Sequence, residues 1–178
     1  MSLPLRSLAN GLTIARAVAG LPLILALQAD AAALAWWLLL MAGLSDAADG
    51  WLARRAGGGS SWGARLDPLT DKVLIAAPLL WLAAAGTLPL WAVWLLLARE
   101  LLISGWRSQA GDGGPASLAG KGKTVLQFLA LLLMLWPPSW SGHQQLLVAG
   151  WWLFWPSLLL AVSSAVAYIR PRSGPHQR

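Results

Sequence analysis

Six long apolar blocks fill almost the whole chain, and they constrain its fold more than any other feature of the sequence. The blocks cover residues 12–29, 31–45, 73–86, 88–106, 124–137 and 145–168, with short turns after the first, third and fifth blocks and longer polar segments after the second and fourth. A helix needs about 20 residues to cross the hydrocarbon core of a bilayer, and backbone amides in lipid must be satisfied within the helix itself. The sequence therefore predicts an all-α integral membrane protein with six transmembrane helices. Residues 1–170 form one predicted domain, and residues 171–178 a short basic tail.

The distribution of basic residues orients this predicted bundle. All 13 Lys and Arg residues fall on one side, and the opposite turns near Asp30, Gly86 and Ser139 contain none. Because cytoplasmic segments of membrane proteins carry the excess of Lys and Arg, both termini are predicted to face the cytoplasm of a bacterial inner membrane. Trp residues near the block ends, such as Trp36 and Trp136, fit interfacial belts. The net charge of +6, spread over one membrane face, favours anionic head groups or phosphates and not nucleic acid as partners.

An acidic motif lies between the second and third blocks. Four of the seven acidic residues occur within a 26-residue stretch, in the pattern D-x2-D-G-x2-A-R-x8-G-x3-D-x3-D. The first half shares one face of a helix end and consists of Asp46, Asp49, Gly50 and Ala53, with Arg54 next. The second half forms a matching stripe at the start of the next helix and consists of Gly63, Asp67 and Asp71. The loop between them is expected to fold the two stripes together, so that four carboxylates converge.

Four converging carboxylates at a membrane require cations, because buried or clustered charges there are costly unless they bind something. Hard oxygen ligands without His or Cys suit Mg²⁺ or Mn²⁺, and four carboxylates can hold two ions that bridge phosphate oxygens. Gly50 and Ala53 leave the helix surface bare for a ligand, and Arg54 offers a fork for a phosphate. This chemistry favours metal-assisted displacement at phosphorus. The alternative interpretation is a solvated helix cap, in which the Asp residues pair with neighbouring basic side chains.

The motif resembles the signature of the CDP-alcohol phosphatidyltransferases, six-helix membrane enzymes, and matches it residue for residue. The resemblance implies the CDP-alcohol phosphotransferase fold and two divalent metals held by the four Asp residues. It implies that Asp71 is the general base, which deprotonates an alcohol for attack on the β-phosphorus of CDP-diacylglycerol while CMP leaves. It also implies contacts to CDP-diacylglycerol from small and polar residues, which are Gly50, Ala53, Arg54, Ser60, Asn10 and Thr13.

Three further segments are similar to the phosphatidylglycerophosphate synthases, one branch of that family. They are N-x-L-T-x2-R from Asn10, R-E-x3-S-x2-R from Arg99, and S-x2-G-K-x-K-T-x2-Q from Ser117. The likeness implies glycerol 3-phosphate as the acceptor alcohol. Positive charge for its phosphate is expected from Arg107, Lys121 and Lys123. A supporting set is expected around them, consisting of Gly63, Glu100, Thr124 and Gln127. Glu100 shares a helix face with Ser104 and Arg107, where its carboxylate could hold an Arg in position.

Alternatives stay open for the acceptor and for the class of protein. The sequence after Arg107 and the plain loop at residues 57–59 depart from the usual family pattern, and both border the presumed acceptor pocket. Other acceptors are therefore alternatives: phosphatidylglycerol as in cardiolipin synthase, inositol phosphate, or serine. A more distant alternative is a divalent-cation transporter, which would need polar residues through the bilayer depth. A homodimer is expected from the resemblance alone. His143 and His176 lack partners at metal-binding spacing and are expected to be inert surface residues.

Overall fold

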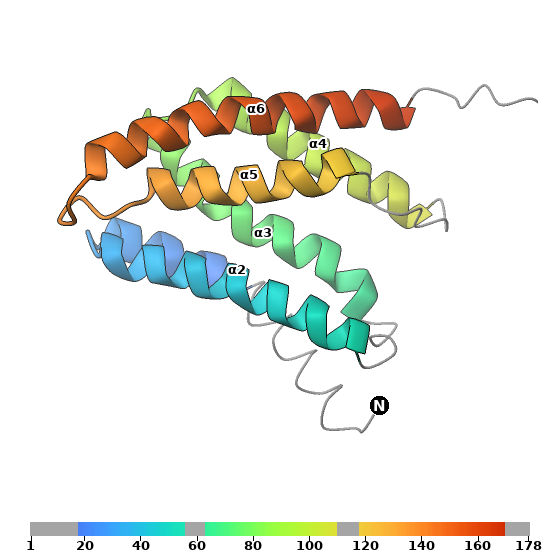
Figure 1. Cartoon of the computed structure of the whole chain (residues 1–178), viewed down its shortest axis with the longest axis horizontal. Coiled ribbons are helices and arrows are strands. Elements are labelled where there is room, and N and C mark those ends of the chain that lie inside the picture. Colours follow the sequence, from blue (N-terminus) through green and yellow to red (C-terminus); the bar gives the residue numbers. More distant parts are fainter. Residues whose placement is uncertain (1–17, 56–62, 110–117, 170–178) are drawn as a thin grey trace, which may run out of the picture.

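The computed structural model describes residues 18–55, 63–109 and 118–169, and within these the side chains of 18–45, 72–105 and 122–166. In these ranges the chain is helical apart from its turns, as the apolar blocks predict. A first helix includes Val18–Gln28. Five more follow in order: α2 (Ala32–Arg55), α3 (Gly63–Ala84), α4 (Leu90–Gln109), α5 (Leu118–Met134) and α6 (His143–Ile169). Figure 1 shows these helices gathered into one bundle.

The tight turns between helices form where the sequence supplies residues that leave the helical backbone conformation. Gly86, between α3 and α4, has φ of 72°, and Gly142, just before α6, has φ of 79°. Glycine adopts this left-handed conformation without the steric cost that a Cβ would add. Asp30 occupies the same region, with φ of 56°, in the turn before α2. These turns reverse the direction of the chain before α2, α4 and α6.

The reversals bring alternate helix ends to the same end of the bundle. The end of α2 and the start of α3 lie together at the lower right of Figure 1, and the ends of α4 and α6 and the start of α5 also lie on the right. The turns before α2 and α6 lie on the left. Both halves of the acidic motif therefore belong to the same end of the bundle as the end of α4 and the start of α5. This arrangement agrees with the two sides that the basic residues indicate.

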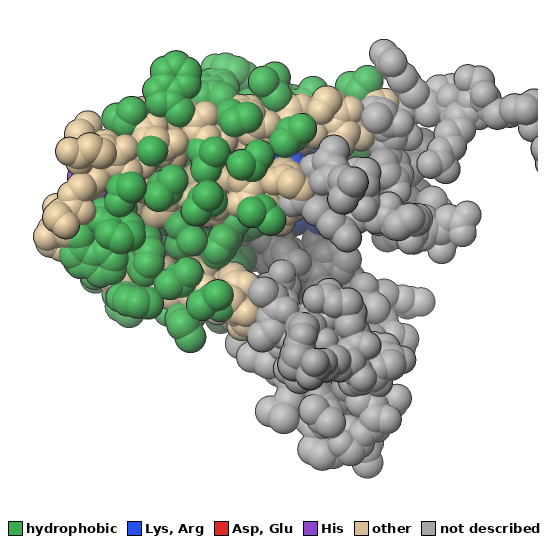
Figure 2. All heavy atoms as spheres, viewed as in Figure 1, with side chains coloured by type: hydrophobic (Ala, Val, Ile, Leu, Met, Phe, Trp, Pro, Cys, Tyr) green, Lys and Arg blue, Asp and Glu red, His purple; other side chains and the backbone are tan. Residues whose placement is uncertain are grey.

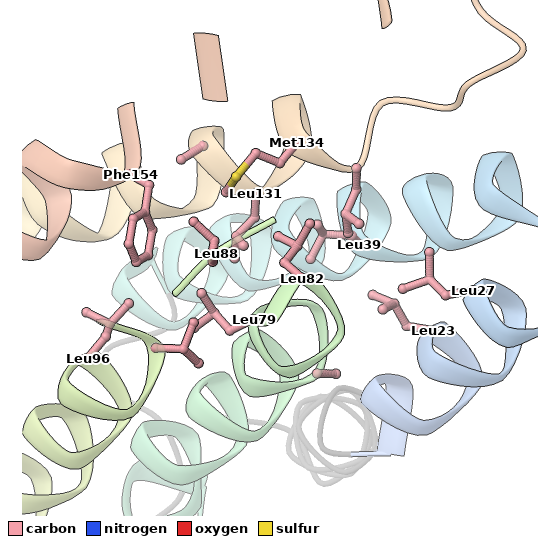
Figure 3. Packing of buried hydrophobic residues seen from close by; sticks show 14 of the residues in the cluster. Leu23, Leu27, Leu39, Leu79, Leu82, Leu88, Leu96, Leu131, Met134 and Phe154 are labelled. Carbon is pink, nitrogen blue, oxygen red and sulfur yellow. The ribbon is translucent and has the colours of Figure 1, made fainter. Parts of the chain in front are cut away.

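Leucine and alanine side chains fill the interior between the helices. Figure 3 shows Leu79 and Leu82 of α3 packed with Leu88, Leu131 of α5 and Leu39 of α2, and Phe154 of α6 lies against the same cluster. Each of these side chains is at most 4% exposed. α5 and α6 pack along each other as an antiparallel hairpin. Close-packed interiors of this kind fix the relative positions of the helices that carry the motif.

The outer surface of the described helices is strongly apolar. Large hydrophobic side chains such as Trp94, Leu102 and Leu159 are 68–72% exposed. Figure 2 shows hydrophobic side chains over the described face, with Lys and Arg visible only near its right-hand edge. Extended apolar surfaces are rare on monomeric soluble proteins and mark contact with lipid or with another protein. This surface supports membrane association.

One helical stretch, His143–Val166 of α6, is both long and apolar enough to cross a membrane by itself, among the residues that the structure describes. Shorter apolar stretches occur in four other helices: Val18–Gln28, Ala32–Ser45, Lys72–Ala84 and Gly122–Met134. Six membrane spans and the cytoplasmic position of the termini therefore stay predictions.

Candidate functional site

The acidic motif occupies the adjoining ends of two consecutive helices. The residues from Asp46 to Arg54 belong to the last part of α2, and Gly63, Asp67 and Asp71 belong to the first part of α3. The prediction that both halves of the motif are helical is confirmed. Their side chains lie outside those that the structure describes, so their convergence and their roles stay predictions. Ser60, Asn10 and Thr13 also lie outside the described residues.

The donor set of this motif fits a pair of hard divalent cations. Asp46 and Asp49 are one helical turn apart in α2, as are Asp67 and Asp71 in α3, and the two helix ends lie at the same end of the bundle. Within each helix, side chains three or four residues apart share a face. Carboxylate oxygens are the ligands that Mg²⁺ and Mn²⁺ prefer in proteins. Among the side chains that are described elsewhere in the chain, no group of three or more His, Asp or Glu offers an alternative metal site.

A network of charged side chains links α4, α5 and α6 in the same half of the bundle. Arg99 Nη1 lies 2.8 Å from Glu100 Oε1, and the ammonium of Lys123 donates to that same carboxylate oxygen. The three side chains are 13%, 15% and 5% exposed, in the order Arg99, Glu100, Lys123. Two cations on one carboxylate satisfy its charge, as a charged group in a largely apolar helix requires.

Arg99 is also bound to the last helix. Its Nε donates to the carbonyl oxygen of Ala161 at 2.8 Å, and its Nη2 donates to the hydroxyl of Ser164 at 2.7 Å. Ser164 in turn donates its own proton to the Ala161 carbonyl oxygen at 2.9 Å. A guanidinium group carries its five N–H donors in a rigid plane, so three simultaneous contacts fix its orientation. α6 thus reaches the charged network although it contains no part of the motif.

The other predicted site residues of α4 and α5 differ in how far the structure describes them. Gln127 lies one helical turn after Lys123 and is 3% exposed, whereas Thr124 lies on an exposed face of α5. The side chains of Arg107 and Lys121 fall outside those that are described, and their proposed contacts with an acceptor phosphate stay predictions. The sequence predicts Glu100 as the holder of an Arg on its own helix face. Among the described side chains, the structure shows it holding its neighbour Arg99 and, across the helix interface, Lys123, while a contact with Arg107 stays a prediction.

Sequence reasoning missed the part of the network that lies on α6. The signal for its α4 half was present, because Arg99 and Glu100 interrupt an apolar helix, and ionisable residues at membrane depth are functional candidates by default. Nothing in the sequence distinguishes Ser164 from the neighbouring Ser163. Only the packing of α4 against α6 selects one of the two serines as the partner of Arg99.

His143 is a correction to the sequence analysis. It was expected to be an inert surface residue, but it begins α6, is partly buried, and its Nδ1 lies 2.6 Å from the carbonyl oxygen of Trp136. Since a carbonyl oxygen accepts, Nδ1 is the donor. The bond ties the start of α6 to the turn that precedes it, so His143 has a structural function.

A hollow of about 580 Å³ opens at the other end of the bundle. Its walls include Trp81 and Thr87 from the end of α3 and the turn after it, and Trp136 and His143 from the turn before α6 and the start of α6. This position is opposite the acidic motif, so the hollow is no part of the candidate site.

Comparison with known proteins decides the family. The family model described as CDP-alcohol phosphatidyltransferase matches residues 6–163, which include the acidic motif and the whole charged network except Ser164. The chain belongs to the CDP-alcohol phosphatidyltransferase family. The resemblance that the motif indicates is thereby confirmed, and with it the general class of the protein as a transferase.

Individual relatives of this CDP-alcohol phosphatidyltransferase cover most of the chain. A probable phosphatidylglycerophosphate synthase of Mycobacterium tuberculosis is 36% identical over 171 residues, which are 92% of this chain and 80% of that protein. A CDP-diacylglycerol–glycerol-3-phosphate 3-phosphatidyltransferase of Rickettsia felis is 31% identical and covers 93% of this chain and 94% of its own length. A protein of Arabidopsis thaliana with the same name and the number 2 is 33% identical over 162 residues.

Proposed function

We propose that this enzyme transfers the phosphatidyl group of CDP-diacylglycerol to glycerol 3-phosphate, giving phosphatidylglycerophosphate and CMP. The observation that carries the proposal is the complete acidic motif on the adjoining ends of α2 and α3, in a chain whose relatives are named for this reaction. The three further segments at Asn10, Arg99 and Ser117 point to the same branch of the family.

In the proposed reaction the alcohol oxygen of the acceptor attacks the β-phosphorus of CDP-diacylglycerol. A new P–O bond forms to the acceptor, the bond from that phosphorus to the bridging oxygen of the pyrophosphate breaks, and CMP leaves with the bridging oxygen. Asp71 takes the proton of the alcohol as general base. Gly50, Ala53 and Arg54 hold the cytidine diphosphate part against α2, where Arg54 pairs with a phosphate.

Two divalent cations, Mg²⁺ or Mn²⁺, would be held by Asp46, Asp49, Asp67 and Asp71. When bound, they neutralise charge on the phosphate oxygens and on the leaving group. Removing the carboxylate of one Asp takes away oxygen ligands from the pair, so metal affinity and catalysis are expected to fall together.

The acceptor is proposed to be anionic because of the cations at the same end of the bundle. Arg107, Lys121 and Lys123 are the proposed phosphate contacts, with Gly63, Thr124 and Gln127 in support. A Lys ammonium has three N–H donors, so the bond from Lys123 to Glu100 leaves donors for a second anionic partner.

The enzyme is further proposed to be a multi-pass protein of a bacterial inner membrane, with the site facing the cytoplasm and the acyl chains of the substrate staying in the bilayer. The helices α2 to α6 contain 17–27 residues, which at about 1.5 Å per residue is roughly the thickness of a hydrocarbon core. The apolar outer surface and the one-sided basic residues support this placement. A homodimer through membrane helices is part of the same proposal.

A panel of acceptors tests the proposal. The purified protein, in nanodiscs with CDP-diacylglycerol and either Mg²⁺ or Mn²⁺, is given radiolabelled glycerol 3-phosphate, phosphatidylglycerol, inositol phosphate or serine. The expected result is CMP release with glycerol 3-phosphate alone, whose label enters the lipid phase. Phosphatidylglycerol is already a lipid, so its use is scored by CMP release and by conversion of the labelled lipid to a new product. Label from another alcohol would reassign the acceptor within the family. Mg²⁺ uptake into proteoliposomes with no CMP release from any acceptor would overturn the transferase and favour a transporter.

A further inference from the structure

In the charged network on α4, α5 and α6, the donor and the acceptor of each hydrogen bond can be assigned. The hydroxyl of Ser164 has one proton, which it donates to the Ala161 carbonyl oxygen, so toward Arg99 it can act only as an acceptor. Arg99 has no acceptor atoms and donates to both of these groups and to Glu100. The donor and acceptor roles in these hydrogen bonds cannot be exchanged. The bonds therefore hold the guanidinium group of Arg99 in a single orientation.

Glu100 connects Arg99 to Lys123. Its Oε1 atom accepts hydrogen bonds both from Arg99, on the same helix, and from Lys123 of α5. A lysine side chain is a flexible stem of four carbons without the rigid plane of a guanidinium group, so by itself it does not hold its ammonium group in one position. The carboxylate of Glu100 therefore holds the ammonium group of Lys123 in place. Arg99 holds that carboxylate in place, and the contacts with α6 hold Arg99 in place.

Among the described side chains, the network carries more positive than negative charge. Arg99 and Lys123 place two cations on the one carboxylate of Glu100. Lys123 is buried and Arg99 is partly buried. A cationic group in such surroundings binds an anion more strongly than it would in water, because the solvent screens it less.

We infer that Arg99 and Ser164 form a clasp that positions Lys123, through Glu100, for the phosphate of the acceptor alcohol. The inference rests on the proposed function, because it uses the acceptor site that the function requires. It adds that α6 takes part in acceptor recognition through a hydroxyl and a backbone carbonyl, although it contains no part of the motif. Arg99 and Ser164 act through another residue and are positioning residues.

Two adjacent serines of α6 give a matched pair of variants. Ser164 accepts the bond from Arg99, whereas the exposed Ser163 bonds only the Leu160 carbonyl oxygen of its own helix, at 3.3 Å, among the described contacts. Ser164→Ala removes the contact to Arg99 with the loss of one atom. Ser163→Ala makes the same chemical change one residue away, and Ser164→Thr keeps the hydroxyl. Arg99→Lys keeps the charge but loses the planar fork.

The experiment measures initial rates in nanodiscs while glycerol 3-phosphate and CDP-diacylglycerol are varied in turn. Ser164→Ala is expected to raise the apparent KM for glycerol 3-phosphate about three- to tenfold, the factor of one net hydrogen bond, and to change that for CDP-diacylglycerol less than about twofold. Arg99→Lys should raise the first constant further. Ser163→Ala and Ser164→Thr should resemble the unaltered enzyme.

The inference is overturned if Ser164→Ala leaves both constants unchanged or raises both equally, or if Ser163→Ala has the same effect as Ser164→Ala. Thermal unfolding of each variant in detergent identifies any loss of the fold. If Arg99→Lys does not fold, the comparison of Ser164→Ala with Ser163→Ala still tests the inference. The unaltered enzyme tests the proposed function separately. If it uses another alcohol, the function fails. If it uses glycerol 3-phosphate but the serine variants do not separate the two constants, the inference alone fails.

Discussion

Gly150 of α6 faces the carbonyl oxygen of Ala130 of α5 so closely that a Cβ placed on it would lie 2.7 Å from that oxygen. The same Cβ would lie 2.8 Å from a side-chain carbon of Met134. Small residues let membrane helices approach closely, and here the obstacle is backbone, which cannot turn aside. Gly150→Ala is therefore expected to destabilise the α5–α6 hairpin by about 1–3 kcal/mol. The free energy of unfolding in mixed detergent micelles measures this.

Gly105→Ala is the control for that prediction. The described part of the chain leaves open space where a Cβ on Gly105 of α4 would stand. Alanine favours a helix over glycine by about 1 kcal/mol, so this variant should be as stable as the original protein or more so. A Gly150→Ala protein that unfolds at the same point as Gly105→Ala would contradict the close approach of α5 and α6.

Trp36 closes the end of α5. The last carbonyl groups of a helix lack partners within it, and the indole N–H of Trp36 donates to one of them, the carbonyl oxygen of Leu132, at 2.9 Å. Trp36→Phe keeps most of the ring contacts with Trp136 and Trp140 but loses this bond. The expected loss of stability is about 1 kcal/mol in the same unfolding assay. Trp37→Phe, at a half-exposed ring, should cost less, and an equal cost would argue against the cap.

The sequence alone predicts the helices and the turns of this protein because both depend on local chemistry. Apolar blocks of helical length set the helices, and Gly86 and Gly142 take the left-handed conformation where two of the turns occur. The ends of the apolar blocks indicated the ends of the helices less well than the spacing of the motif residues did. The apolar blocks end at residue 45 and resume at residue 73, whereas α2 continues to Arg55 and α3 begins at Gly63. The i, i+3 and i, i+4 spacing of the Asp residues was the correct indicator there.

Contacts between distant helices were not predictable, since one sequence has no record of which faces meet. Trp36 is separated from Leu132 by 96 residues, and Arg99 from Ser164 by 65. Composition indicated an interfacial role for Trp36 but not its bond to α5. In the same way, the sequence marked Glu100 as a supporting residue, but the crossing of α4 and α5 decides that Lys123 is its partner.

Asp71 is the proposed general base, and Asp71→Asn tests that role. An amide keeps the size of the side chain but cannot accept the proton of the alcohol, so turnover should fall by at least about 10²-fold. Binding of CDP-diacylglycerol, measured by calorimetry, should be retained. Asp30→Asn makes the same change in a turn at the opposite end of the bundle, where Asn tolerates the positive φ, and should leave activity unaltered. Turnover by Asp71→Asn near the original rate would refute the assignment.

Asp67 is proposed as a metal ligand and not as the base. Asp67→Ala removes one carboxylate from the pair of ions, so the metal concentration for half-maximal activity should rise by at least about tenfold. Titration of activity with Mg²⁺ and with Mn²⁺ after treatment with a chelator gives this value. The original enzyme should lose activity in the chelator and recover it when metal is added. Normal activation of Asp67→Ala by both metals would exclude it as a ligand.

Arg107 is proposed to bind the phosphate of the acceptor, with its guanidinium fork on two phosphate oxygens. A hydrogen bond to a charged group contributes about 1.5–3 kcal/mol, so Arg107→Ala should raise the apparent KM for glycerol 3-phosphate about 10- to 100-fold. The KM for CDP-diacylglycerol should change little, because that substrate is proposed to be held by the motif on α2. Arg107→Lys keeps the charge without the fork and should give an intermediate value. Equal increases in both constants for Arg107→Ala would place this residue outside the acceptor pocket.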